Sequence, residues 1–372
     1  MIYLDNAATS FTKPLQVKNA VNVAMNLYTA NAGRGAHTLS QLSAEKIYDT
    51  RQKLLKFFNA KNHKVIFTSG CSSALNFAIL GSVKQGGHII TTSLEHNSVL
   101  RPLQYLKDIG VIDYTVIDNY TISELNKAVR ANTYMVITTQ ASNVTGEHLD
   151  ILNINKWCRK NGFLHLVDTA QGAGHIFEDL SEIDMIAFAG HKGLFGLGGV
   201  GGLVVKEGIE LKPILFGGTG TFSESLMQPT AIPEGFEVGT VANIPIISLG
   251  AGIDYVIHNK QYILSKEERL NKQLSSMLNS LNFVTPYFSK DSVGVYSFNV
   301  CDYDSSFVSD FLNEKYAICT RSGLHCAPLV HKKLSTLDRG AVRVSVNCDN
   351  SEYDIEILQS ALKQLYSINN KK

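Results

Sequence analysis

Short apolar runs alternate with amphipathic stretches between residues 65 and 206. Buried strands rich in Val, Ile, Thr and Phe are predicted at VIFTSG, HIITTS, YMVITTQAS, FLHLVD and MIAFAG. Apolar residues spaced three and four apart predict helices at SSALNFAILGSV, NSVLRPLQYLKDIG, TISELNKAVRAN and DILNINKWCRKNG. The third of these begins with a capping box, Thr121 to Glu124. This alternation predicts an α/β fold with a mostly parallel sheet covered by helices.

The pattern changes after about residue 207. Residues 214–240 contain several Gly and Pro residues, which favours irregular structure, and two long helical patterns follow from Asn243 to about Leu281. Strands at VGVYSFNV and AVRVSV, with helices near 303–316 and 351–368, indicate a smaller α+β unit. We therefore predict a large domain over residues 15–259, and a small α+β domain made of residues 1–14 and 260–372.

Composition narrows the class of protein. The 372 residues are 44% hydrophobic and 18% charged, and the formal net charge is +1, so no global field favours nucleic acid or an anionic membrane. Apolar runs stay shorter than the roughly 18 residues that span a bilayer. The six cysteines form no C-x-x-C pair, which is typical of a reducing cytosol. A cytoplasmic protein with small-molecule partners is expected.

Ligands of such sheets lie beyond the carboxyl ends of the strands, so the residues that follow each strand are candidates. Gly70, Cys71, Ser72 and Ser73 lead into a predicted helix, where N–H groups and hydroxyls suit a phosphate, although a plain Ser cap has the same pattern. His96 follows the next strand. Asn143 follows the third and is equally typical of a turn.

Two further strand ends carry stronger signals. Asp168 ends an apolar strand, where an acid requires a cation or several donors, and Gln171 follows one turn later. Lys192, after His191, lies in an almost uncharged glycine-rich stretch that would lower its pKa and favour Schiff-base chemistry. The glycines of 196–201 match G-x-G-x-x-G but lead into a strand-like GLVV, so we reject a dinucleotide site and expect the backbone to pass close to a ligand.

In chain order these strand ends supply a phosphate-binding turn, a histidine that can stack on an aromatic ring, an acid and a lysine. Pyridoxal 5'-phosphate requires such a set, with the acid for its pyridine nitrogen and the lysine for its aldehyde. The sequence resembles the class V, fold-type I family of pyridoxal-phosphate enzymes, in the cysteine desulfurase and selenocysteine lyase branch. The motifs that carry the resemblance cover nearly the whole chain: YLDNAATS, GRGAHTLS, EHNS, SNVTGE, VDTAQ, GHK, FEVGT, RSGLHCAP and VRVSVN.

The resemblance implies a role for each matched residue. Lys192 would bind the cofactor as a Schiff base and remove the Cα proton, and Asp168 would pair with the pyridine nitrogen. His96 would stack on the ring. The remaining implied cofactor contacts are Gln171 to the ring hydroxyl, Ser72 and His191 to the phosphate, and Thr240 from the second subunit of a homodimer. The implied substrate-binding residues are Asn143, Arg321 and Arg343.

The stretch RSGLHCAP places Cys326 in a Gly- and Pro-bearing loop, and by itself this pattern fits a nucleophile, a metal ligand or a turn residue. It resembles the loop of the nucleophilic cysteine in SufS-like desulfurases. That resemblance implies conversion of L-cysteine to L-alanine, a persulfide on Cys326, and transfer to an acceptor protein, for example for iron–sulfur cluster assembly. L-selenocysteine is a second expected substrate.

Two classes of alternative stay open from the sequence. One is a class V aminotransferase, an epimerase or a C–S lyase on another amino acid. A different class is a metal- or sulfur-binding protein that uses His325, Cys326 and His331, although no second cysteine pair lies nearby.

The chain also departs from the family pattern at Ala189, where relatives usually carry a phosphate-binding Ser.

Overall fold

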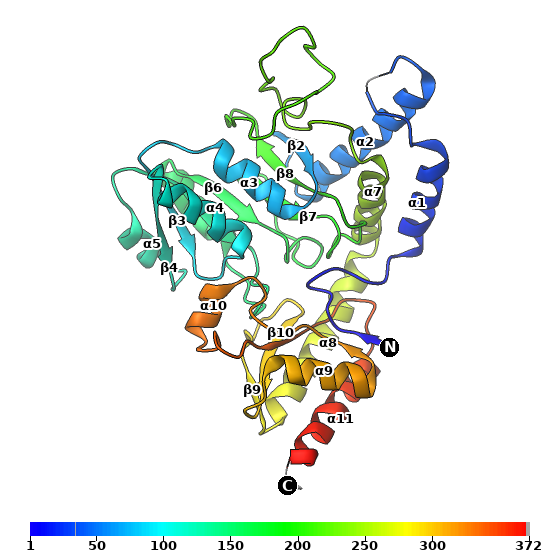
Figure 1. The fold of residues 1–372 in the computed structure, drawn as a ribbon, viewed down its shortest axis with the longest axis vertical. Helices are drawn as coiled ribbons and strands as arrows, with labels where there is room; N and C mark the ends of the chain where they lie inside the picture. Colours follow the sequence, from blue (N-terminus) through cyan, green and yellow to red (C-terminus); the bar gives the residue numbers. More distant parts are fainter. Residues whose placement is uncertain (34, 370–372) are drawn as a thin grey trace.

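The computed structural model describes residues 1–33 and 35–369, and its centre is a seven-stranded sheet (Figure 1). The strand order is β2 (His63–Thr68), β8 (Gly201–Lys206), β7 (Met185–Ala189), β6 (Leu164–Asp168), β5 (Thr133–Thr139), β3 (Gly87–Thr92) and β4 (Ile112–Ile117). Only β8 runs antiparallel to its neighbours in this sheet. The predicted mostly parallel α/β sheet is therefore confirmed, and the carboxyl ends of six of its strands lie along one edge.

Both faces of the sheet are covered because its strands are apolar on both sides. Leu203 and Val205 pack into one apolar cluster, whereas Val204 between them packs into another, as the period of two along a strand requires. The first cluster includes α3 (Cys71–Gly81) and α4 (Asn97–Asp108), and the second includes α2 (Thr38–Phe57) and α7 (Asn243–His258). Helices α5 (Ile122–Ala128) and α6 (Ile151–Asn161) cover the β3–β5 region.

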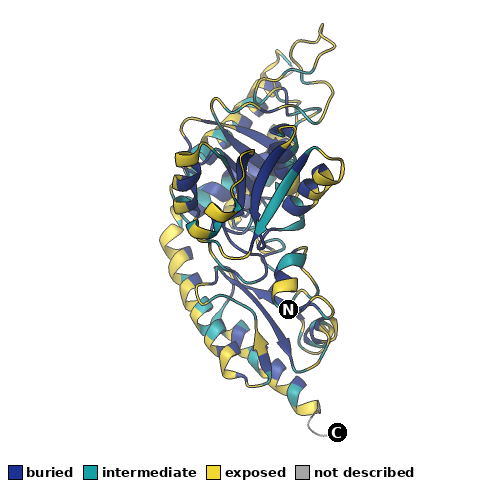
Figure 2. Cartoon of the chain, turned by 90° about the vertical axis from the view of Figure 1, so that its left-hand side faces the viewer, coloured by how far each residue is buried: buried dark blue, intermediate teal, exposed yellow. Residues whose placement is uncertain are grey.

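A second core forms around an antiparallel sheet of β12 (Val342–Ser345), β10 (Val295–Val300) and β9 (Val284–Pro286). The helices that pack on it are α8 (Lys260–Ser280), α9 (Ser305–Tyr316) and α11 (Glu352–Asn369). Leu4 belongs to this core, and β1 (Ile2–Tyr3) pairs in parallel with β11 (Ile318–Cys319). Figure 2 shows this unit beneath the larger one, with buried strands in both. The exact domain bounds stay a prediction.

The sequence pattern missed several elements. It did not predict α1 (Leu15–Leu27), α2, β4 or the short α10 (Pro328–Lys333), and α5 is shorter than the predicted 121–132. Thr121 caps α5, since its hydroxyl accepts from the Glu124 N–H at 3.3 Å. Residues 214–240 form neither helix nor strand, as expected.

Arg34, inside the GRGAHTLS motif, and residues 370–372 lie outside the described residues. No helix of the described residues has the length and apolarity to cross a membrane.

Candidate active site

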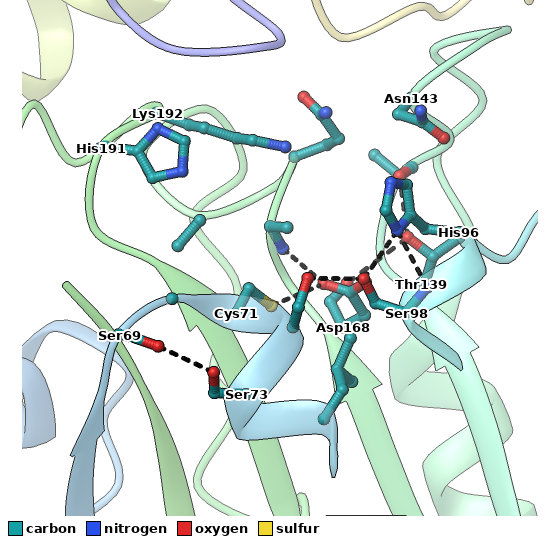
Figure 3. Close-up of a pocket in the computed structure, with 17 residues that line it drawn as sticks. Ser69, Cys71, Ser73, His96, Ser98, Thr139, Asn143, Asp168, His191 and Lys192 are labelled. Carbon is teal, nitrogen blue, oxygen red and sulfur yellow. Dashed lines mark hydrogen bonds between the residues drawn. The ribbon is translucent and has the colours of Figure 1, made fainter. Parts of the chain in front are cut away.

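A cavity of about 260 Å³ lies at the carboxyl edge of the large sheet (Figure 3). It collects the residues that follow five strands, because parallel strands place their carboxyl ends along the same edge. The cavity contains seven of the predicted site residues: Ser72, His96, Asn143, Asp168, Gln171, His191 and Lys192. It does not contain Cys326, Thr240, Arg321 or Arg343.

The turn between β2 and α3 forms one wall of the cavity. The N-cap of α3 is Gly70, so no side chain caps this helix, and the predicted alternative of a plain Ser cap is wrong. The first helical N–H groups, those of Cys71 and Ser72, therefore have no acceptor within the helix. A helix N-terminus of this kind suits an anion.

Two glycines of the G-x-G-x-x-G match, Gly196 and Gly201, allow backbone to pack on backbone, whereas a Cβ on Gly198 would meet nothing within 4 Å. The expected approach of this backbone to a ligand stays a prediction. A Cβ added to Gly201 would lie 2.7 Å from the carbonyl carbon of Gly70 and 2.8 Å from the Cys71 nitrogen. A Cβ on Gly196 would lie 2.9 Å from the Gly190 oxygen. Gly201 thus lets β8 lie directly against the α3 turn.

Asp168 ends β6 on the floor of the cavity and is buried. Its Oδ1 accepts from the Ala170 N–H at 2.8 Å and from the Cys71 thiol at 3.3 Å. Burial and the adjacent Asp168 charge raise the pKa of Cys71, so this thiol stays protonated and donates. Among the described residues no cation forms an ion pair with Asp168. The acid therefore retains acceptor capacity toward a cationic group in the cavity.

Lys192 and His191 follow β7. Burial lowers the pKa of Lys192; Arg343 adds to this effect and Asp168 opposes it. The direction agrees with the sequence argument, since the neutral amine is the nucleophilic form. Burial also lowers the pKa of His191 to about 4, with a contribution from the charge of Lys192. His191 is thus a neutral imidazole near pH 7.

His96 occupies the opposite wall and belongs to a chain of polar contacts. Its Nδ1 lies 2.9 Å from the Ser98 hydroxyl and accepts from the Ser98 N–H at 3.0 Å. The Ser98 hydroxyl lies 2.6 Å from that of Ser72. Burial lowers the pKa of His96, although Asp168 opposes the shift. The imidazole is therefore fixed in orientation and favoured in its neutral form.

Arg343, on β12, is only 2% exposed and sits close enough to Lys192 to affect its pKa. Its guanidinium donates to Asp5 Oδ1 at 2.7 Å and to the Asn143 carbonyl at 3.1 Å, while its Nε has no partner. Asp5 lies in the YLDNAATS motif, but we did not predict it as a site residue. The guanidinium has five N–H donors, so further acceptors can bind to it.

Gln171 donates to the Ala7 carbonyl at 3.0 Å.

Glu95 is a second residue that the sequence reading missed. It is fully buried behind His96, and its Oε1 accepts from the Thr92 hydroxyl at 2.6 Å and the Thr139 N–H at 2.8 Å. Its Oε2 has no partner. Burial raises the pKa of Glu95 to about 8, although these hydrogen bonds oppose the shift. The available signal was an acidic residue three positions after the end of β3, directly before His96.

Cys326 lies outside the cavity but beside it. It is exposed and lines a groove on the α3–α4 face that shares Ser72, His96 and Ser98 with the cavity. The buried His325 anchors the loop that carries Cys326. The carbonyl of His325 accepts from Asn143 Nδ2 at 2.7 Å, and the Nε2 of His325 lies 3.1 Å from the Ala341 carbonyl oxygen. The Asn97 N–H donates to the Cys326 carbonyl at 2.7 Å. The loop is thus tied to both units of the fold.

The last two predicted residues lie further out. Arg321 is exposed, and its backbone pairs with that of Arg343 in both directions, at 2.7 and 3.2 Å. Thr240 is exposed and lines a different hollow, which shares Ser69 and Ser73 with the cavity. Within one chain, Thr240 therefore lies on the far side of the α3 turn from Lys192.

Comparison with known proteins identifies the family of this chain. Residues 2–358 match the family model for aminotransferase class V, whose members use pyridoxal 5'-phosphate. A probable cysteine desulfurase of Methanothermobacter thermautotrophicus is 33% identical over 98% of this chain and 94% of its own length. A structure of the cysteine desulfurase from Thermococcus onnurineus is 32% identical, with a TM-score of 0.90 over 98% of this chain and 94% of that chain. The cysteine desulfurase CsdA of Escherichia coli, 24% identical over 98% of this chain and 94% of that one, has the same fold with a TM-score of 0.86. The chain belongs to the class-V aminotransferase family and is similar to cysteine desulfurases over nearly its full length.

Proposed function

We propose that this protein is a cysteine desulfurase that uses pyridoxal 5'-phosphate, converts L-cysteine to L-alanine and holds the released sulfur as a persulfide on Cys326. One observation carries the proposal. A cavity that contains a buried Asp168 and a lysine of lowered pKa adjoins a groove that contains an exposed cysteine. L-selenocysteine fits the same chemistry, with alanine and reduced selenium as products.

The residues of the cavity fit the cofactor. The uncapped N-terminus of α3, with Ser72 and His191, suits the phosphate group. Asp168, without a cationic partner among the described residues, suits the protonated pyridine nitrogen. His96 would contact the ring face and Gln171 the ring hydroxyl. Ala189 lines the cavity but offers no hydroxyl, so α3 would carry more of the phosphate binding.

Three residues would carry the reaction. When bound, pyridoxal 5'-phosphate acts as an electron sink for the Cα of the amino acid. Lys192 binds the cofactor and, as a neutral amine, takes the Cα proton. Cys326 would attack the substrate sulfur as a thiolate and keep that sulfur: a sulfur–sulfur bond would form as the carbon–sulfur bond breaks, and the electron pair of the broken bond would stay with the carbon, which takes a proton and leaves as alanine. His96 is held neutral and orients the reacting groups.

Substrate orientation would come from the carboxylate. Arg343 is buried, always charged and retains free donors, so it can bind a carboxylate with two parallel hydrogen bonds. Asn143 fixes both Arg343 and the Cys326 loop through its carbonyl and its Nδ2. Arg321 is paired with Arg343 through the backbone and would complete the cationic surroundings.

Assembly and partners form part of the proposal. Thr240 would reach the phosphate of the other subunit in a homodimer, and the exposed apolar side chains of the 214–240 segment and α1 support such an interface. They include Phe216, Leu226 and Met227, with Leu15 and Met25. A sulfur-acceptor protein of the cytoplasm, in iron–sulfur cluster assembly, would receive the persulfide.

The test is a product assay on the protein loaded with pyridoxal 5'-phosphate. The visible absorbance of the bound cofactor is recorded first, and L-cysteine or L-selenocysteine is then added with a thiol reductant. Equal amounts of alanine and sulfide from L-cysteine would support the proposal, and the ratio of the two rates would rank the substrates. A cofactor band without alanine from either substrate would contradict it.

The position of Cys326 favours a second candidate, a C–S lyase that releases sulfide without a persulfide. Cys326 lines the groove rather than the cavity itself. A lyase of this kind would keep its turnover in Cys326→Ala, whereas the desulfurase would lose it.

A further inference from the structure

The groove beside Cys326 has two helical walls. Ser72, Asn76 and Leu80 lie four residues apart and form one stripe along α3. The facing stripe on α4 consists of Asn97, Ser98, Arg101, Pro102 and Tyr105. At 1.5 Å per residue, the stripe from Ser72 to Leu80 is about 12 Å long. The α3 and α4 helices that form the walls lie side by side (Figure 1).

The helix polarity makes the Cys326 end of this groove electropositive. Ser72 lies in the first turn of α3, and Asn97 is the first residue of α4, so both helices begin near Cys326. The N-termini of helices carry partial positive charge, and the Asn97 N–H already donates to the Cys326 carbonyl at 2.7 Å. An anionic ligand is therefore favoured at this end of the groove.

The side chains of the groove add to this positive potential. Arg101 is exposed one turn along α4 from Asn97, and within the described part of the chain its guanidinium forms no ion pair or hydrogen bond. None of the described residues that line the groove is acidic. Burial is the main reason why the pKa of His96 is lowered, and the charge of Arg101 adds a smaller effect in the same direction. The electrostatic field of Arg101 therefore reaches the cavity side of the groove.

The chemistry of the groove selects one kind of occupant. Its volume of about 500 Å³ is large enough for a small thiol. A thiol at one end would meet Cys326, and an anionic group about one helical turn further along would meet Arg101. We propose that this groove also receives a small thiol that carries a carboxylate, as a sulfur acceptor additional to the acceptor protein, and that Arg101 selects this thiol by charge.

The transfer step is balanced without an added oxidant. The acceptor loses its thiol proton to solvent, and its thiolate attacks the outer sulfur of the Cys326 persulfide. The sulfur–sulfur bond on Cys326 breaks, a new one forms on the acceptor, and the Cys326 thiolate leaves and is reprotonated. This inference rests on the proposed function, because it requires a persulfide on Cys326.

The experiment uses three thiols that differ mainly in charge: 3-mercaptopropionate, 2-mercaptoethanol and cysteamine. Protein loaded with pyridoxal 5'-phosphate is treated with L-cysteine and freed of excess, and loss of the persulfide is followed after addition of each thiol. The readout is the rate with each charged thiol divided by the rate with 2-mercaptoethanol, compared between the wild type and Arg101→Gln. This comparison cancels the intrinsic reactivity of each thiol.

We expect Arg101→Gln to lower the ratio for 3-mercaptopropionate about two- to fivefold and to raise that for cysteamine, as an exposed charge pair allows. Arg101→Lys should retain the wild-type preference, and high salt should remove it. Lys156→Gln removes an exposed charge from α6, outside the groove, and should keep the wild-type ratios. Equal ratios in the wild type and Arg101→Gln would overturn the inference. A protein that never forms the persulfide would instead contradict the proposed function itself.

Discussion

The Lys192 cavity and the Cys326 groove share one wall but differ in nearly every physical property. The cavity is built from five strand ends, and burial lowers the pKa values of its Lys192, His191 and His96. The groove is built from two helix surfaces and a loop, and its charged side chain is exposed. A buried cavity suits proton transfer at a carbon atom, whereas an open groove suits the exchange of sulfur with an incoming partner. Ser72, His96 and Ser98 connect the two.

The largest expected effect is that of Lys192→Ala. Without the amine the cofactor cannot be held covalently and the Cα proton has no acceptor, so we expect alanine formation to fall at least about 10³-fold. The visible cofactor band should be lost as well, which absorbance measures. Lys64→Ala, at an exposed position of β2, is the matched control. A retained band with ordinary turnover would show that the cavity is not the reactive site.

Cys326→Ala should separate the two regions. The cavity stays intact, so the cofactor band should remain, while sulfide release should fall at least about 10²-fold because the nucleophile is missing. Cys301→Ala, which lies in neither region, should behave as the wild type. Sulfide assays on the three proteins measure this. Normal turnover in Cys326→Ala would favour the C–S lyase.

Arg343→Lys tests how the substrate carboxylate is held beside the Lys192 cavity. Lys keeps the charge but cannot offer two parallel donors, so we expect the KM for L-cysteine to rise about tenfold with a smaller change in kcat. Because Arg343 also pairs with Asp5, the melting temperature of the variant must be measured alongside. A fall in kcat with an unchanged KM would assign Arg343 to the chemical step instead.

The last prediction concerns stability and not turnover: it is the pH dependence of unfolding that Glu95 produces. Since its pKa is raised to about 8, the folded protein holds this proton at pH values where the unfolded chain has lost it. The carboxyl therefore favours folding below its unfolded pKa, and this contribution is lost as the pH rises toward about 8. Glu95→Gln has no proton to lose, so it should gain stability relative to the wild type by up to about 1.4 kcal/mol per pH unit across that window. Unfolding by urea at several pH values would show this, and a pH-independent difference would contradict it.

The cavity was largely predictable from the sequence, because each of its residues follows an apolar run that can only be a buried strand. Asp168 and Lys192 are conspicuous there as charged residues among apolar neighbours. Arg343 was found only through the resemblance to a known family, since its contact with Asp5 joins residues 338 positions apart. Long-range pairs of this kind leave no local pattern.

The groove was not predictable, since it depends on how α3 and α4 lie against the Cys326 loop. Helix α1 escaped prediction for a related reason: it buries only Val17 and Ala24 in the single chain, while Leu15 and Met25 are exposed. Its apolar spacing therefore does not follow one buried face. The left-handed φ of Cys326, 57°, is likewise set by the anchoring of His325 and not by a glycine.

The measurement that tests the central claim most directly is the mass of the peptide that contains Cys326 after a single turnover. Protein loaded with pyridoxal 5'-phosphate is mixed with less than one equivalent of L-cysteine, without reductant, and then alkylated and digested. The account predicts one additional sulfur atom on Cys326, in an amount equal to the alanine formed. Alanine without added sulfur on Cys326 would contradict it.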